Sequence, residues 1–185
     1  MAKQRLGRPR ETGRKGIYRG KIFRVSQCSL RFRNGERAVH DLVEHDGAAV
    51  FVPIPEPGKL ILIRQYRHAA RGYLWEIPAG RLEKGERPLA AAKRELAEEC
   101  GLTARRWHKA ASFLPAPGYT DEVMHLFFAY DLAPDQSGAR PDQDEEIEMR
   151  TFSLAEISEW MRSGRIRDGK TLVAFAYLLA QTRAE

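Results

Sequence analysis

The residues best suited to do chemistry are five glutamates in the stretch GRLEKGERPLAAAKRELAEECGL, residues 80–102. On a helix, Glu95 and Glu99 would share one face because they are four residues apart. Glu98 would lie beside them, four residues after Arg94, with which it can pair. Like charges at this spacing mildly destabilise an isolated helix, and a divalent cation among them would reverse that effect. Such oxygen ligands suit Mg²⁺ or Mn²⁺, although a solvated helix face is the ordinary alternative.

The ends of this helix are marked by the sequence. Pro88 suits the first turn, where a missing N–H costs nothing, and Gly101 is placed to end the helix. Alternating or apolar segments before the helix predict strands. These segments are residues 21–32, 37–45, 48–54, 59–67 and 74–78. Asn34-Gly35 predicts a hairpin between the first two. The helix is therefore expected to follow a short strand and a loop.

The spacing within residues 80–102 resembles the Nudix box. Gly80, Glu86 and the run RELAEECGL from Arg94 stand at the defining positions of that motif. The resemblance implies a loop–helix–loop that binds divalent metal and cleaves a nucleoside diphosphate linked to another moiety. It also implies an α/β fold, the Nudix α/β/α sandwich around a mixed β-sheet, here with an N-terminal antiparallel strand region.

The resemblance assigns roles to residues of the motif. Glu95, Glu98 and Glu99 stand where the family has metal-ligating carboxylates, and Ala79 stands where it uses a backbone carbonyl. The implied cofactor is Mg²⁺, or Mn²⁺. The positions expected to be structural are Gly80, Glu86, Arg94 and Gly101.

The segments beside the motif resemble ADP-ribose pyrophosphatases and related nucleotide-sugar hydrolases. These segments are RQYRHAARGYLWEIPAG, residues 64–80, and LPAPGYTDE, residues 114–122. A small-molecule nucleoside diphosphate is thus the expected substrate, with Arg67, Trp75 and Glu122 as its contacts. Arg67 could fork onto phosphate oxygens or form a strand-end salt bridge. Trp75 could stack on a base or belong to the core.

The general base is expected in the acidic segment PDQDEEIEM, residues 141–149. Related enzymes often take a catalytic glutamate from an acidic loop after the box. Glu145 is the first candidate and Glu146 the second, with Glu98 as a further catalytic candidate. A solvated acidic loop without a catalytic role is the alternative.

The net charge of +6 is concentrated near the N-terminus, where residues 1–17 hold six basic side chains against Glu11. This tail is expected to be disordered, and residues 18–185 to form one domain. Relatives are commonly homodimers whose N-terminal strands reach the other subunit, so residues 18–46 are the expected dimer interface. Nucleic-acid contact by the tail is a weaker expectation, because short basic motifs are unspecific.

Composition narrows the class of protein. No apolar run approaches the length of a membrane span, the N-terminus has no apolar signal region, and Cys28 and Cys100 give no disulfide framework. A cytoplasmic protein is expected. Two functions remain open: a metal-dependent pyrophosphohydrolase, and a binding module that senses ADP-ribose or a nucleotide sugar and touches nucleic acid through its tail. The intact carboxylate set favours the enzyme.

Overall fold

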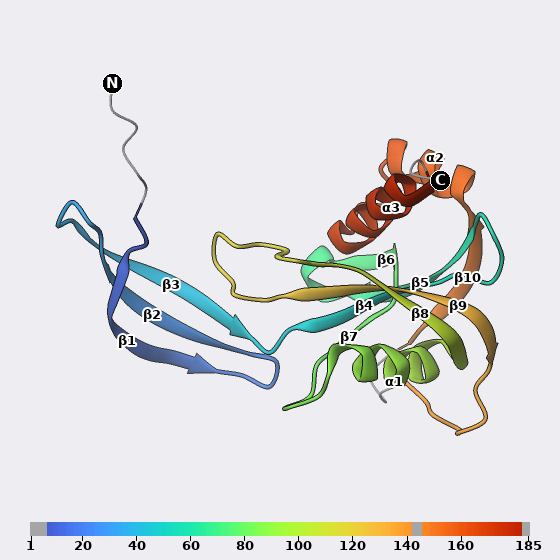
Figure 1. Cartoon of the computed structure of the whole chain (residues 1–185), viewed down its shortest axis with the longest axis horizontal. Coiled ribbons are helices and arrows are strands. Elements are labelled where there is room, and N and C mark those ends of the chain that lie inside the picture. Colours follow the sequence, from blue (N-terminus) through green and yellow to red (C-terminus); the bar gives the residue numbers. More distant parts are fainter. Residues whose placement is uncertain (1–6, 142–145, 183–185) are drawn as a thin grey trace. The chain divides into compact units, whose positions relative to one another are not determined.

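The computed structural model describes residues 7–141 and 146–182 (Figure 1). The chain divides into two compact units. The smaller contains Met1–Asp46 and Ala116–Val123, and the larger contains Gly47–Pro115 and Met124–Glu185. This division differs from the single domain expected for residues 18–185.

The larger unit is built on two sheets. The four-stranded sheet has the order β7 (Ala79–Arg81), β4 (Ala48–Pro53), β9 (Met124–Pro134), β8 (Leu102–Phe113). It is mixed, because β4 runs parallel to β9 while the other pairs are antiparallel. The second sheet is antiparallel, in the order β10 (Glu148–Ser153), β5 (Lys59–Arg67), β6 (Gly72–Glu76). A short 3₁₀ turn, His68–Ala70, joins β5 to β6.

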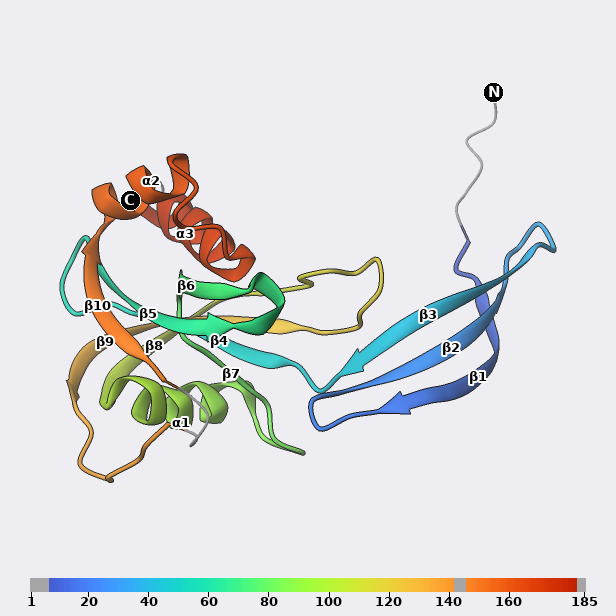
Figure 2. The same ribbon diagram turned by 180° about the vertical axis from the view of Figure 1, so that it is seen from behind.

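Helices cover both faces of these sheets. Helix α1 (Pro88–Cys100) lies on one side, and α2 (Leu154–Arg162) and α3 (Gly169–Thr182) lie on the other (Figures 1 and 2). The strands supply both cores by alternation. In β4, Val50 and Val52 join the core beneath α2 and α3, whereas Ala49 and Phe51 join the core beneath α1. The predicted α/β/α sandwich is therefore confirmed.

The predicted helix ends are also confirmed. Pro88 opens α1, and Gly101 ends it in the left-handed region at φ 61°, a conformation that favours glycine. At α2, the Ser153 hydroxyl accepts from the Glu156 N–H, while the Glu156 carboxylate accepts from the Ser153 N–H. This reciprocal pair is a capping box.

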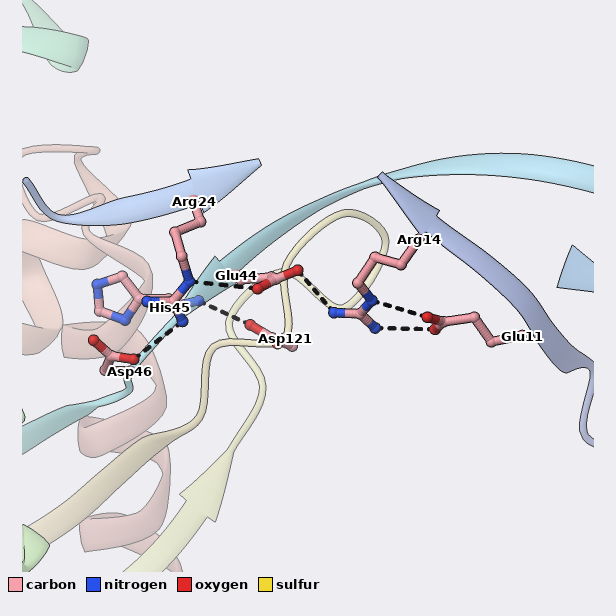
Figure 3. Close-up of polar contacts among 7 residues, drawn as sticks. All are labelled: Glu11, Arg14, Arg24, Glu44, His45, Asp46 and Asp121. Atoms are coloured by element: carbon pink, nitrogen blue, oxygen red, sulfur yellow. Dashed lines mark hydrogen bonds and ion pairs between the residues drawn. The ribbon is translucent and has the colours of Figure 1, made fainter. Parts of the chain in front are cut away.

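The smaller unit contains an antiparallel sheet in the order β1 (Arg10–Arg19), β2 (Phe23–Arg31), β3 (Arg37–His45). Gly35, at φ 89°, allows the predicted hairpin turn. Strand β1 corrects the disorder expected for residues 10–17, while residues 1–6 lie outside the described residues. A segment can form an edge strand when a neighbouring strand supplies backbone hydrogen-bond partners. β2 supplies the partners, and Arg14 pairs with Glu11 at 2.8 Å and Glu44 at 2.7 Å (Figure 3).

The segment Ala116–Val123 is held against β3. Val43 N–H donates to the Tyr119 carbonyl at 2.8 Å. His45 N–H donates to Asp121 Oδ1 at 2.9 Å (Figure 3). No helix in the described part of the chain is long and apolar enough to cross a membrane.

Candidate active site

Arg94 gathers the acidic side chains of the loop and of α1. Its Nη1 donates to Glu95 Oε1 at 2.7 Å and to Glu98 Oε2 at 2.8 Å. Its Nε and Nη2 each donate to Glu86 at 3.1 Å, and Nη2 also donates to the Arg81 carbonyl. The hydrogen bonds from Arg94 hold the pKa of Glu86 below its ordinary value, because they stabilise the ionised carboxylate. Arg94 thus ties the loop to the helix, which is the contact pattern of a structural residue.

Gly80 and Glu95 are in unusually close contact. A Cβ built on Gly80 would lie 1.8 Å from Glu95 Cδ and 2.0 Å from its Oε1. Only a glycine can leave that space to the carboxylate. Glu95 therefore lies directly on the backbone of β7, where Ala79 is the preceding residue.

Glu99 follows Glu95 by one helical turn and is buried, with 7% of its surface exposed. Glu99 lies on the sheet-facing side of α1, where Ala92 and Leu96 are also buried. Carboxylate oxygens and a backbone carbonyl, the donor types expected here, would be hard ligands that fit Mg²⁺ or Mn²⁺. In residues 7–141 and 146–182, no three His, Cys, Asp or Glu side chains already converge as a metal-binding group. The donor types fit such an ion, while the present conformation commits Glu95 and Glu98 to Arg94.

Arg67 lies at the end of β5 and forms a salt bridge, the alternative that the sequence left open. Its Nε donates to Glu76 Oε1 at 2.7 Å. The Arg67 side chain is 40% exposed, whereas that of Glu76 is 1% exposed. Glu76 pairs directly with Ile63 across the sheet, and Ile63 belongs to the core beneath α1. Arg67 and Glu76 therefore share the sheet face of Ile63. Because β6 is an edge strand of this sheet, Lys170 of α3 also reaches Glu76 there.

Trp75 packs against aromatic side chains of the larger unit, and its role as a substrate contact stays a prediction. Its ring packs edge-on against Phe152 at 5.0 Å and Trp160 at 6.2 Å between centroids, within the core beneath α2 and α3. Successive side chains of a strand point to opposite faces of the sheet. Because Glu76 shares the face of Ile63, the Trp75 side chain lies on the other face. Trp75 is half-buried and packs against this core.

The two candidates for the general base differ in what is known of their positions. Glu145 lies outside the described residues. Glu146 accepts a hydrogen bond from the Tyr73 hydroxyl at 3.3 Å. Tyr73 precedes Trp75 by two residues on β6 and shares its face, so Glu146 lies at the sheet face opposite to that of Glu76.

Glu122 belongs to the smaller unit, where its Oε1 lies 3.4 Å from His45 Nδ1. Its role as a substrate contact stays a prediction.

Sequence reasoning gave no role to Lys170, Glu76 and Gln65, whose polar side chains are buried. Lys170, at the start of α3, contacts Glu76, and both are almost fully buried. Gln65, on β5, is 5% exposed, and its Nε2 has no hydrogen-bond partner in the described part of the chain. The available signal was a charged or amide residue inside an otherwise apolar strand, as in IRQY and LWEIP, because such residues are rarely buried without a reason.

Comparisons with known proteins point the same way as this geometry. A family model described as the NUDIX domain matches residues 43–174. An ADP-ribose pyrophosphatase of Bacillus subtilis (strain 168) is 35% identical over 162 residues, which cover 88% of each chain. A methanol dehydrogenase activator of Bacillus methanolicus is 34% identical over 165 residues, which cover 89% of each chain. A crystal structure of an ADP compounds hydrolase superposes with a TM-score of 0.85 at 26% identity, covering 98% of this chain and 97% of the other.

Proposed function

This chain belongs to the Nudix family of pyrophosphohydrolases, and we propose that it splits ADP-ribose, or a related nucleotide sugar, into AMP and a sugar phosphate with Mg²⁺ or Mn²⁺. The observation that carries this proposal is the contact of Glu95 with Gly80, beside Ala79 and one turn before buried Glu99. This contact supports the proposal because it holds the Glu95 carboxylate against the backbone of β7, next to Ala79. The similarity to an ADP-ribose pyrophosphatase and to an ADP compounds hydrolase supports an ADP-containing substrate.

Glu95, Glu99 and the Ala79 carbonyl are the groups that would hold the cation. When bound, a divalent ion neutralises diphosphate charge and lowers the pKa of a coordinated water. The chain's own contribution is to keep these donors in place. Gly80 leaves room for Glu95, and Arg94 limits repulsion among the carboxylates by pairing with them.

Arg67 would bind the diphosphate. Its Nε is held by Glu76, so the fork of its two Nη groups is the part that can face phosphate oxygens in a bidentate contact. Glu145 is the proposed general base, accepting the proton of the attacking water. Glu146 is the weaker candidate because it bonds Tyr73 on the opposite face, and Glu98 because it pairs with Arg94.

The test is turnover of a panel containing ADP-ribose, ADP-glucose, ADP-mannose and GDP-mannose, with Mg²⁺ and with Mn²⁺. Products are separated by chromatography, and AMP with ribose 5-phosphate is the expected pair from ADP-ribose. E99Q should remove turnover while keeping nucleotide binding. The matched control is E159Q, which alters an exposed glutamate paired only with Arg162 among the described residues. Binding without turnover in the unchanged chain would favour the sensing module instead.

We also propose a homodimer that buries the sheet β1–β3. Exposed apolar side chains lie on these strands and their turns: Ile17, Tyr18, Ile22, Phe23 and Val39. β1 is also a sheet edge exposed along its length, and such edges and patches favour association. Light scattering should give twice the mass of the chain. A single-chain mass for the intact protein at all concentrations tested would reject this proposal.

A further inference from the structure

A buried carboxylate links the proposed diphosphate-binding arginine to the C-terminal helix. Glu76 is 1% exposed, and its two oxygens have different cationic partners. Oε1 accepts from Arg67 Nε at 2.7 Å, and Oε2 accepts from Lys170 Nζ. A charge buried this deeply is costly unless it is paired and hydrogen-bonded. Both oxygens meet that condition, so the carboxylate has a defined orientation.

The lysine partner is itself fixed. Lys170 is 8% exposed on its side chain, and its Nζ also lies 3.2 Å from Asp168 Oδ1. Asp168 Oδ2 accepts from the Thr171 hydroxyl at 2.6 Å and from the Thr171 N–H at 2.9 Å. The first turn of α3 is thus held by its own polar side chains, with Lys170 directed at Glu76.

A second contact joins the same two elements. The Thr171 Oγ1 accepts from the Ile77 N–H at 2.9 Å. Ile77 follows Glu76 directly and precedes Ala79 by two residues. The start of α3 therefore holds both the side chain of Glu76 and the backbone leading into the proposed metal-binding segment.

The four charged groups of this network balance one another. Arg67 and Lys170 carry two positive charges, and Glu76 and Asp168 carry two negative charges. The four groups together are neutral before any substrate binds. Arg67 is the most exposed of the four, at 40% against 8% for Lys170, 1% for Glu76 and 16% for Asp168. The network therefore meets solvent mainly through the Arg67 guanidinium.

From this arrangement we infer that Glu76 is a positioning residue that holds Arg67 for the substrate diphosphate, with Lys170 as the buried counter-ion that orients Glu76. This inference rests on the proposed function. A long arginine side chain loses rotamer freedom when it binds a ligand. Glu76 imposes that loss in advance, and it does so through Nε, so the Nη fork keeps its geometry for phosphate oxygens.

A double-mutant cycle between Arg67 and Glu76 tests this inference. R67A should lower kcat/KM on the order of 100-fold, since a phosphate contact and its positioning are both lost. E76Q should lower kcat/KM about tenfold, mainly through a higher KM, because the amide removes the charged acceptor of Arg67. In the R67A background, E76Q should add less than about a twofold loss, because a positioning residue has nothing left to position.

A purely structural role makes a different prediction. If Glu76 only stabilises the fold, E76Q multiplies the R67A loss and changes Tm without raising KM, and that result overturns the inference. If E76Q does not fold, E76Q/K170Q replaces it in the cycle, because that pair removes one charge of each sign. E159Q is again the surface control.

A binding measurement separates this inference from the proposed function. α,β-Methylene-ADP in the presence of Mg²⁺ is titrated into each variant by calorimetry. The positioning role is supported if R67A, E76Q and the double variant R67A/E76Q all bind this probe more weakly than the unchanged chain, and all by about the same factor. Turnover by the unchanged chain with independent losses in the two variants overturns the inference alone. No turnover of any nucleoside diphosphate derivative by the unchanged chain overturns the proposed function, and the inference with it.

Discussion

The carboxylate of Glu95 occupies the space that a side chain at Gly80 would need, with only 1.8 Å between an added Cβ and Glu95 Cδ. The helix and the short strand β7 thereby approach each other at the one residue type that permits it. Glu95, a proposed metal ligand on α1, can therefore take this position only because Gly80 on β7 has no side chain.

Replacing Gly80 by alanine should displace Glu95. Because displacement of a catalytic group by about 1 Å can cost about 100-fold in rate, we expect G80A to lose at least that factor in kcat. Steady-state assays on the best substrate of the panel measure it. E159Q is the control, because Glu159 is an exposed residue of α2, outside the proposed site and the proposed dimer interface. Full activity of G80A would show that the contact has no functional weight.

Metal binding should be measurable without turnover. An ion that binds only the folded chain stabilises it by about 2.7 kcal/mol at 100 times its Kd. We expect Mg²⁺ to raise the Tm of the unchanged chain and to leave the Tm of E95Q/E99Q almost constant, because two ligands are gone. Calorimetric scans with and without Mg²⁺ compare the two. An equal rise in both chains would place the ion elsewhere.

The contact of Arg94 with Glu86 should give stability that depends on pH. Arg94 lowers the pKa of Glu86 in the folded chain, so folding favours the ionised carboxylate. The resulting stability is complete above the ordinary pKa of about 4.3 and is lost as pH falls through the lowered value. We expect E86Q to cost about 1–3 kcal/mol at pH 7. Denaturant unfolding should show the gap between the two chains closing below about pH 4, and a gap that widens there would contradict this prediction.

Trp75 should matter for stability and not for substrate affinity. Its ring packs on Phe152 and Trp160, so W75A should cost about 3–5 kcal/mol of unfolding free energy. W75F keeps an aromatic ring and should fold with an unchanged KM. Unfolding curves and steady-state kinetics distinguish the two effects. A raised KM in W75F at normal stability would support the stacking role instead.

The choice of general base is decided by two substitutions in one acidic segment. We expect E145Q to lower kcat by about 100- to 10,000-fold, the range typical of a lost general base. E146Q should be nearly as active as the unchanged chain, because Glu146 bonds Tyr73. Y73F, which removes that bond, should also be active. The reverse result for the two glutamates would make Glu146 the base.

The predicted elements that agree with the structure depend on neighbours in the chain. The hairpin at Gly35 and the ends of α1 at Pro88 and Gly101 each follow from the conformation of a few adjacent residues. Strand β1 was missed because its sequence is basic and rich in glycine, and only pairing with β2 makes it a strand. Local signals contain no information about such a partner.

What the sequence determined by itself is the acidic motif, the helix that carries it and the alternation of the strands around it. The tertiary structure alone decided which side chains meet. Sheet register put Glu76 on the face of Ile63 and Trp75 on the other, and the return of α3 brought Lys170 to Glu76 across 94 residues of chain. The physical reason is that a backbone conformation depends on adjacent residues, whereas a buried charge pair depends on how distant segments pack.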